Sequence, residues 1–213
     1  MNFNRPKILV FSGACHSGKT TSMNFIKDLL ESKGKKVVFL SEIIRSYNIS
    51  SIDDIRRDPN MYMDLQDTII TEKMMSEIKA YQTFGEDTVV LVDRAITDSF
   101  FYFTFYVNKN ELDDEHYEKF VSLYNKLNYY LKQTDKIYTY VFEFEPIKEI
   151  NEEDSFRPKR LKQAQNIEYE MIKKYNELFF KESGKLVNVN LNDVSLENTK
   201  EYWNKLLKKL DIQ

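Results

Sequence analysis

Residues 13–20 constrain this chain more than any other stretch. They read Gly-Ala-Cys-His-Ser-Gly-Lys-Thr and fit the pattern G-x-x-x-x-G-K-S/T. The two glycines let the backbone curl so that successive N–H groups point inward at phosphate oxygens. Lys19 has the length to reach the β- and γ-phosphates of a nucleotide, and the Thr20 hydroxyl suits Mg²⁺ as a ligand. We therefore predict a phosphate-binding loop here.

The neighbouring sequence supplies the setting that such a loop requires. A short apolar strand is predicted from Lys7 to Ser12, and a helix from Thr20 to Ser32 carries its apolar residues at helical spacing. The positive end of that helix dipole would face the same anion. The residues expected to contact the nucleotide are Gly13, Ala14, Cys15, His16, Ser17, Gly18, Lys19, Thr20 and Thr21.

Composition narrows the class of protein. A chain of 213 residues with 42% hydrophobic and 31% charged residues suits one α/β domain over residues 1–213. The net charge of −3 gives no global basic field for nucleic acid or anionic membrane, which leaves a nucleic-acid partner only a local groove. No apolar run is long enough to span a bilayer, and Cys15 is the only cysteine, which excludes a disulfide framework. We expect a cytoplasmic protein.

Five short apolar runs alternate with helical patterns along the chain. This alternation predicts a parallel sheet with helices on both faces, a three-layer α/β/α sandwich. Gly34, Gly85 and Gly184 each follow a helical pattern and are expected to end the helix before a strand. The predicted strands are 7–12, 36–40, 88–92, 136–142 and 185–189.

A long helix is predicted from about Met61 to Tyr81, between the second and third strands. Gln66 lies on its apolar face, so its amide needs hydrogen-bonding partners. Either Gln66 is a core residue bonded to nearby backbone, or its amide faces a ligand; the sequence does not decide between the two. The other residues of that face are Met63, Ile70, Met74, Ile78 and Tyr81.

Asp93 and Arg94 follow the third strand, and six aromatic residues then crowd into residues 100–106. A helix this apolar is buried or lines a pocket. Packing accounts for most of these rings, while one or two could stack on a base. His116, at the start of the next helix, is expected to lie at the surface and not to act as a ligand.

Residues 143–160 are the most irregular part of the sequence, acidic first and basic last. A charged segment over a phosphate site is typical of a lid, which closes, excludes water and supplies arginines to transition-state charge. Arg157 and Arg160 are the candidates; the alternative is a solvated loop whose arginines pair with neighbouring carboxylates. The next helix carries at helical spacing Ala164, Ile167, Met171, Tyr175 and Leu178.

Other nucleotide-binding classes lack their motifs in this chain. A GTPase needs N-K-x-D and D-x-x-G, yet none of the three Asn-Lys pairs has Asp two residues after its Lys. An ABC ATPase needs a glycine-rich signature, and an AAA+ machine needs a longer chain. The sequence then favours a small kinase.

The chain from the loop to about Phe180 resembles the P-loop nucleoside and nucleotide kinases, especially the NadR-like (ribosylnicotinamide kinase) ATPases and the thymidylate and deoxynucleoside kinase group. The resemblance implies a P-loop NTPase fold with a lid, bound ATP and Mg²⁺, and a nucleoside or nucleotide acceptor. The matching features beyond the loop are Glu42, Arg45, Gln66, Asp93, Arg94, Arg157 and Pro158.

The resemblance also assigns roles. Glu42 would lie beside the acceptor hydroxyl, orient it and accept its proton, which is worth about 10²–10⁴ in rate for a general base. The ends of strands in open α/β sheets line the ligand crevice, which agrees with this placement. Asp93 would hold Mg²⁺ together with Thr20, and Arg94 would bind the acceptor or the transferred group. Glu42 could instead be structural and bond backbone amides. The remaining acceptor-binding candidates are Arg45 and Gln66.

Two departures from that group bear on the acceptor. Thymidylate kinases usually carry an aromatic residue after Asp-Arg, where this chain has Ala95, and their Arg-Glu-Pro pattern after strand two is missing. The Ser41-Glu42 pair favours a nucleoside-like hydroxyl acceptor over a nucleoside monophosphate. We expect an ATP-dependent kinase that uses Mg²⁺ and phosphorylates a hydroxyl of a nucleoside, nucleotide or related small metabolite. The alternatives are a kinase for DNA ends or hydroxylated bases and a regulatory ATPase, and a homodimer is one option for the assembly.

Overall fold

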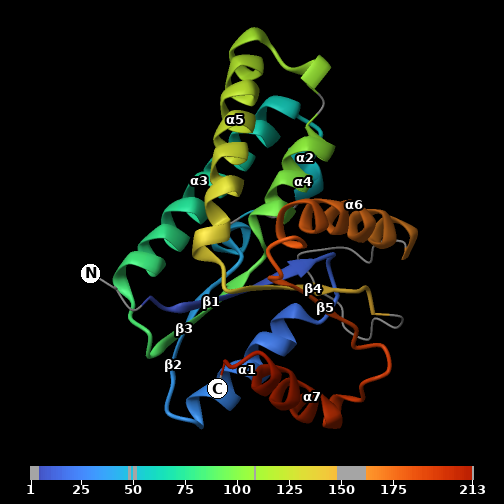
Figure 1. The fold of residues 1–213 in the computed structure, drawn as a ribbon. Helices are drawn as coiled ribbons and strands as arrows, with labels where there is room; N and C mark the ends of the chain where they lie inside the picture. Colours follow the sequence, from blue (N-terminus) through green and yellow to red (C-terminus); the bar gives the residue numbers. More distant parts are fainter. Residues whose placement is uncertain (1–4, 48, 50–51, 108, 148–161, 213) are drawn as a thin grey trace.

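The computed structural model describes residues 5–47, 49, 52–107, 109–147 and 162–212 (Figure 1). Their strands form a five-stranded sheet in the order β2-β3-β1-β4-β5, with every neighbouring pair parallel. The predicted parallel sheet is therefore confirmed. The strands are β1 (Lys7–Gly13), β2 (Lys36–Leu40), β3 (Thr88–Asp93), β4 (Tyr140–Phe144) and β5 (Leu186–Val189).

The centre of the sheet is β1, which pairs with β3 on one side and β4 on the other. In register, Phe11 of β1 lies opposite Asp93 of β3 and Phe142 of β4. Because β2 and β3 lie on one side of β1 and β4 and β5 on the other, β1 stands at a topological switch point. The loop after β1 thus opens into the crevice at the carboxyl ends of the strands, where α/β proteins bind ligands.

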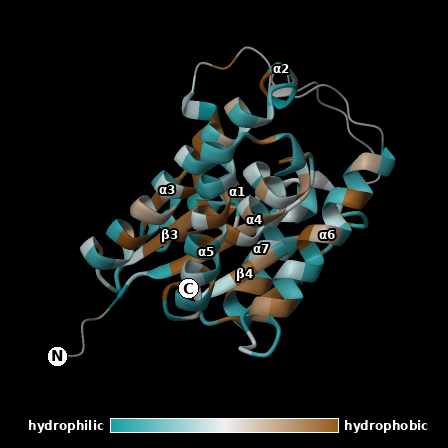
Figure 2. Cartoon of the chain, turned by 90° about the horizontal axis from the view of Figure 1, so that it is seen from above, coloured by the Kyte–Doolittle hydropathy of each residue, from teal (hydrophilic) through white to brown (hydrophobic). Residues whose placement is uncertain are grey.

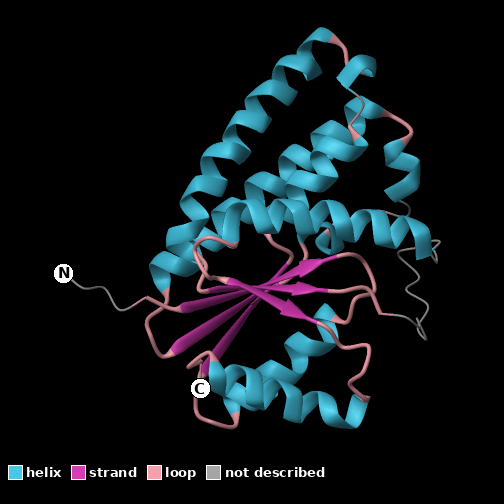
Figure 3. Ribbon diagram, turned by 45° about the vertical axis from the view of Figure 1, so that its right-hand side comes forward, coloured by secondary structure: helices cyan, strands magenta, loops and turns pink. Residues whose placement is uncertain are grey.

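Helices cover both faces of the sheet, which gives the expected three-layer sandwich (Figure 3). One face carries α1 (Lys19–Glu31) and α7 (Leu196–Lys209). The other face carries α3 (Pro59–Thr83), α4 (Ile96–Tyr106), α5 (Asp114–Ile137) and α6 (Lys162–Phe180). Shorter turns are η1 (Ile43–Ser46), α2 (Ile52–Arg56) and η2 (Lys109–Glu111). Among the described helices, none has the length and apolar character that crossing a bilayer requires.

Alternating residues of each strand supply two hydrophobic cores. Leu9 and Phe11 of β1 point to the layer of α1 and α7, where Trp203 packs near the ring of Phe11. Ile8 and Val10 point the other way, into the larger core under α3, α4 and α5. A sheet buried on both faces explains why its strands are continuous apolar runs in the sequence. In Figure 2 much of β3 and β4 is brown, while teal dominates the outer sides of the helices.

The predicted start of the fourth strand is wrong. The sequence placed it at Lys136, but α5 continues to Ile137. The reason is a hydrogen bond from the Tyr138 N–H to Thr134 O (2.8 Å), which closes the last helical turn. The strand therefore begins only at Tyr140.

The predicted lid, residues 143–160, loses its first two residues to the sheet. Glu143 and Phe144 end β4, where they pair with both β1 and β5. Residues 148–161, and with them Arg157 and Arg160, lie outside the described part of the chain. The lid therefore stays a prediction.

The three glycines predicted to end helices each lie between a helix and a strand, but only two have the left-handed backbone of a helix end. Gly34 and Gly184 have positive φ angles of 79° and 71°, the left-handed conformation in which helices often end. Gly85 does not have a positive φ, and the C-cap of α3 is Phe84 in an extended conformation. Gly85 thus follows the end of α3, as expected, without a left-handed conformation.

Candidate functional site

The predicted loop connects β1 to α1, and both of its pattern glycines have positive φ angles, which favour glycine. Gly13 has a φ of 133°, and a Cβ atom there would lie 2.7 Å from Phe144 O, so the neighbouring strand leaves no room for a side chain. Gly18 has a φ of 85° and is the N-cap residue of α1. The close approach of Phe144 therefore requires glycine at Gly13, while the left-handed conformation favours glycine at Gly18.

The Lys19 ammonium lies inside the loop. Its Nζ donates to Gly13 O (2.9 Å), Ala14 O (2.6 Å) and Ser17 Oγ (3.1 Å). Burial lowers the pKa of Lys19. Thr20, at the start of α1, is exposed. A cation held by loop carbonyls beside an exposed hydroxyl fits a site for nucleotide phosphates and Mg²⁺.

Arg94, directly after β3, connects several parts of the site. Its N–H continues the sheet by donating to Phe11 O (2.9 Å), yet its φ of 72° turns the chain sharply. The guanidinium donates from Nε to Glu42 Oε1 (2.5 Å) and from one terminal nitrogen to Gly13 O and Asp98 Oδ2 (both 3.3 Å). Burial alone would lower the pKa of Arg94, but Glu42 and the other groups around it raise the pKa well above its usual value.

Glu42 follows β2 and is the N-cap residue of η1. Its second carboxylate oxygen lies 3.1 Å from Arg45 Nε, so two arginines hold the carboxylate. Glu42 exposes 10% of its side chain and Arg45 46%, which places Arg45 on the solvent side. The structure thus brings Glu42, Arg45 and Arg94 together at the carboxyl ends of β2 and β3.

Asp93 and Gln66 differ from these residues in their contacts. Asp93 is the last residue of β3 and is half-buried. Burial lowers the pKa of Lys19, and the negative charge of Asp93 acts in the opposite direction, so the two side chains are close enough to interact electrostatically. Gln66 is 4% exposed on α3, and none of the described residues hydrogen-bonds its side-chain amide. No described contact therefore supports a core glutamine bonded to backbone, and the alternative, an amide that faces a ligand, stays a prediction.

Asp98, in the first turn of α4, is a site residue that the sequence analysis did not single out. It is fully buried, accepts from the Ser12 hydroxyl, and accepts from the Gly13 N–H at 3.2 Å. Burial raises the pKa of Asp98, against the charge of Arg94. The available signal was the spacing of four residues from Arg94 at the start of a helix, which lets both side chains meet.

α6 supplies two further residues that the sequence analysis missed. Gln165 Nε2 donates to Cys15 O (2.6 Å), and Glu168 Oε1 accepts from the Cys15 N–H (3.2 Å). The Tyr102 hydroxyl also donates to Glu168. Gln165 and Glu168 are 2% and 1% exposed. α6 therefore packs against the loop with polar side chains and fixes the backbone on both sides of Cys15.

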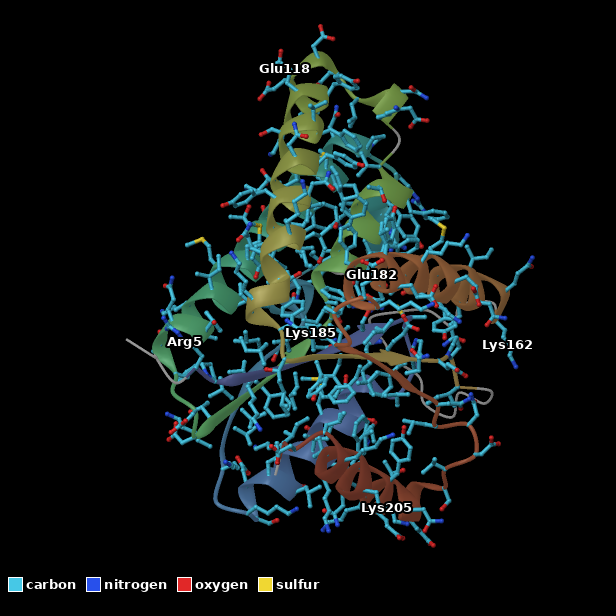
Figure 4. The ribbon with its side chains drawn as sticks, viewed as in Figure 1. Arg5, Glu118, Lys162, Glu182, Lys185 and Lys205 are labelled. Carbon is cyan, nitrogen blue, oxygen red and sulfur yellow. The ribbon has the colours of Figure 1, made fainter. Side chains whose placement is uncertain are left out.

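The apolar residues of α6 found in the sequence do not mark the buried face of the helix. Ile167 and Leu178 belong to the apolar set found in the sequence, yet they are 47% and 71% exposed. In Figure 4 the helix lies between the labelled Lys162 and Glu182. The inner face of α6 contacts α4, β1 and β4. Polar residues lie on this face because the buried backbone groups of the loop need hydrogen-bonding partners.

A second buried network lies under the loop. Asn176 of α6 donates from Nδ2 to Ser12 Oγ (2.8 Å) and Glu143 Oε2 (3.0 Å), and its Oδ1 accepts from the Thr97 hydroxyl (2.5 Å). Burial raises the pKa of Glu143 to about 7. Asn176 thus ties β1, β4 and α4 together at the carboxyl end of the sheet.

Most aromatic residues of α4 pack in the interior. Phe101 and Phe103 are 1% and 0% exposed, whereas Phe105 is 50% exposed. The Tyr102 ring lies against the Arg94 guanidinium, whose carbon is 5.0 Å from the ring centroid. Such a contact stabilises a buried cation. A base-stacking role for any of these rings stays a prediction.

His116, at the start of α5, contacts two carboxylates that connect neighbouring helices. Its ring nitrogens lie 2.8 Å from Asp113 and 3.5 Å from Asp64, so it joins the start of α5 to α3. The side chain is 19% exposed, which is less than the surface position expected.

The fold and the loop define the class: this is a P-loop nucleotide-binding protein. A family model described as AAA domain matches residues 8–183, and the chain belongs to this family. This match contradicts the exclusion of an AAA protein that the sequence analysis made on chain length. Among curated proteins, none matches the sequence.

Solved structures share the fold. A NadR protein in complex with NR matches with a TM-score of 0.67 at 19% identity, over 98% of this chain and 52% of that one. A NadR protein in complex with NAD and AMP-PNP matches with a TM-score of 0.62 at 18% identity, over 98% of this chain and 50% of that one. Thymidylate kinase from Candida albicans matches with a TM-score of 0.55 at 15% identity, over 98% of this chain and 93% of that one. At these identities the likeness shows the fold, and the chain spans about half the length of the NadR proteins.

Proposed function

We propose that the protein is an ATP-dependent kinase that transfers the γ-phosphoryl group to a hydroxyl of a nucleoside, nucleotide or related small metabolite. The observation that carries the proposal is the bridge made by Arg94, which contacts Glu42 (2.5 Å) and the Gly13 carbonyl of the loop (3.3 Å). A nucleotide sensor has little need for a carboxylate on the acceptor side. Two structural neighbours, a NadR protein and a thymidylate kinase, support the same class of reaction.

The donor side of the reaction belongs to the loop. Backbone N–H groups of the loop would hold the phosphates, apart from those of Gly13 and Cys15, which donate to Asp98 and Glu168. Lys19 would exchange its loop carbonyls for phosphate oxygens. Thr20 and Asp93 would hold Mg²⁺, which neutralises charge on the phosphates. Positioning and charge stabilisation then carry catalysis, with Arg157 and Arg160 of the predicted lid as additional cations.

The acceptor side belongs to Glu42 and its neighbours. The carboxylate would orient the acceptor hydroxyl and take its proton. The Arg94 guanidinium is already paired with Glu42 and Asp98, so little positive charge remains for an acceptor phosphate, which supports a nucleoside-like acceptor. Arg45 at the exposed side and the amide of Gln66 would contact the rest of the acceptor.

Acceptor-dependent ATP consumption tests the proposal. The protein is assayed with Mg²⁺ against nucleosides, nucleoside monophosphates, nicotinamide riboside and DNA oligomers, alongside Lys19→Ala and a control, Lys200→Ala, on the exposed side of α7. We expect turnover with a nucleoside-like acceptor, lost in Lys19→Ala and kept in Lys200→Ala. Turnover with DNA alone, falling steeply with salt, would indicate a nucleic-acid kinase instead. Slow hydrolysis that no acceptor changes would leave a regulatory ATPase.

A further inference from the structure

Lys73 and Glu77 form an ion pair inside the protein, one turn apart on α3. Lys73 Nζ lies 2.7 Å from Glu77 Oε1, and the two side chains are 7% and 0% exposed. Neither residue was predicted to belong to the site. A buried ion pair is weak support for stability, because taking two charges out of water offsets much of their attraction. This pair therefore needs another explanation.

The Lys73 ammonium also donates a hydrogen bond to Arg94 O, at 2.6 Å. Arg94 has a φ of 72°, a left-handed conformation that residues with a Cβ atom rarely adopt. Its N–H still pairs with β1 through Phe11 O, while its carbonyl meets α3. Lys73 thus satisfies a buried carbonyl at the turn that carries the arginine.

The Glu77 carboxylate connects the same network to the other side of this turn. Its Oε2 accepts from the hydroxyls of Tyr130 (2.9 Å) and Tyr138 (2.7 Å). The backbone N–H of Ile96, the first residue of α4, lies close enough to the Tyr138 hydroxyl to lower its pKa, against the stronger raising effect of burial. One buried network therefore holds the backbone both before and after the turn.

We propose that Lys73 is a positioning residue that acts through Arg94. By holding Arg94 O, the ammonium keeps the left-handed turn, and the turn sets the direction from which the guanidinium reaches Glu42. Without this donor the buried carbonyl would rotate toward another partner and displace the side chain. The inference rests on the proposed function, in which Arg94 and Glu42 face the acceptor, but its structural part is measurable without any acceptor.

Two variants separate positioning from support of the fold. Lys73→Met removes the donor but leaves Glu77 buried without its cation, which destabilises the protein. Lys73→Met/Glu77→Gln removes both charges, and the new glutamine keeps an oxygen for the two tyrosine hydroxyls. We expect the double variant to regain thermal stability. The control is Lys205→Met, which breaks a Lys–Glu pair of the same spacing on the surface of α7.

The first readout is hydrogen exchange at Arg94 Nε, followed by ¹⁵N NMR and assigned by its loss in Arg94→Lys. In the unmodified protein this N–H donates to Glu42 at 2.5 Å, so we expect it to exchange slowly with water. We expect the Arg94 Nε–H to exchange at least about tenfold faster in the double variant, because protection from exchange depends on local structure. We expect no change in Lys205→Met.

The second readout is steady-state kinetics with the responding acceptor. We expect kcat to fall about 10- to 100-fold in the double variant while KM for ATP is unchanged, because a displaced group costs rate in this range. A double variant that keeps either slow exchange or full kcat would overturn the positioning role, and so would one that fails to fold. If no acceptor supports turnover of the unmodified protein, the proposed function fails, and exchange at Arg94 alone decides about Lys73.

Discussion

Arg94 Nε lies 2.5 Å from Glu42 Oε1, and this contact joins the segment after β3 to the segment after β2. The two side chains are 7% and 10% exposed. β2 and β3 are parallel neighbours, so their carboxyl ends meet at one edge of the sheet. Because the same guanidinium also contacts Gly13 O, one residue connects the phosphate loop to the carboxylate proposed to act on the acceptor.

Arg94→Lys keeps the charge and removes the planar fork of the guanidinium. One ammonium cannot contact Glu42, Asp98 and the Gly13 carbonyl together. We expect acceptor-dependent turnover to fall roughly 10²-fold, because the acceptor side loses its geometry, while ATP binding measured by thermal shift changes little. Arg45→Lys, at the exposed neighbour, serves as the control and should lose less. Unchanged turnover in Arg94→Lys would show that the three contacts are dispensable.

Gly13→Ala and Gly34→Ala form a matched pair. Both positions have a positive φ, but only at Gly13 would the new Cβ meet backbone, 2.7 Å from Phe144 O; at Gly34 it meets nothing within 4 Å. We expect Gly34→Ala to lower the free energy of unfolding by about 1–2 kcal/mol. Gly13→Ala should lower it by roughly 1–3 kcal/mol more and abolish stabilisation by ATP. Urea unfolding measures both, and equal losses would contradict the close approach of β4 to the loop.

Lys19→Met removes a buried cation from the loop. The loss of its hydrogen bonds is offset by relief from burying a charge, so we expect little change in Tm without nucleotide. The stabilisation that ATP gives, about 2.7 kcal/mol at a hundredfold excess over Kd, should disappear. Calorimetry with and without Mg-ATP measures both quantities. A variant that ATP still stabilises fully would rule out Lys19 as a phosphate ligand.

Glu143 makes stability depend on pH. Burial raises its pKa from 4.5 to about 7 in the folded protein, against the effect of Asn176. Between these values the folded protein binds more protons than the unfolded chain, so the contribution of Glu143 to stability falls as pH rises from about 4.5 to about 7. Glu143→Gln should therefore gain stability relative to the unmodified protein, on the order of 3 kcal/mol above this range.

Unfolding free energies below and above that pH range check the effect of Glu143. The gain of Glu143→Gln should be small at the acidic end and grow with pH. A gain that is the same at both ends would mean that the carboxyl group does not titrate between them.

Much of the fold could be predicted because its central strands β1, β3 and β4 are buried on both faces. Continuous apolar runs between helical patterns identify such strands, and the glycines of the loop identify β1 and α1. The end of α5 could not be predicted, since one backbone hydrogen bond at Tyr138 decides it. The location in the cell, the assembly and the lid stay predictions.

The site was predictable only where it lies at strand ends. Glu42 and Arg94 follow strands, and parallel strands end at one edge, so their meeting follows from topology. α3 and α6 behave differently, because they pack on a polar loop and turn. The inner faces of these two helices carry polar residues that hydrogen-bond to the loop and the turn. A search for apolar periodicity therefore does not identify Lys73 or Glu168. The left-handed turn at Arg94 has no sequence signal, because contacts far along the chain hold it.

The most direct test of the central claim is a single-turnover measurement of phosphoryl transfer by Glu42→Gln. The glutamine keeps the shape and an oxygen for Arg94 but cannot take a proton from the acceptor. We predict that ATP binds as before and that transfer to the hydroxyl acceptor slows by about 10²–10⁴, with Lys200→Ala unaffected. Transfer by Glu42→Gln at the rate of the unmodified protein would contradict the claim that the carboxylate beside Arg94 acts on the acceptor.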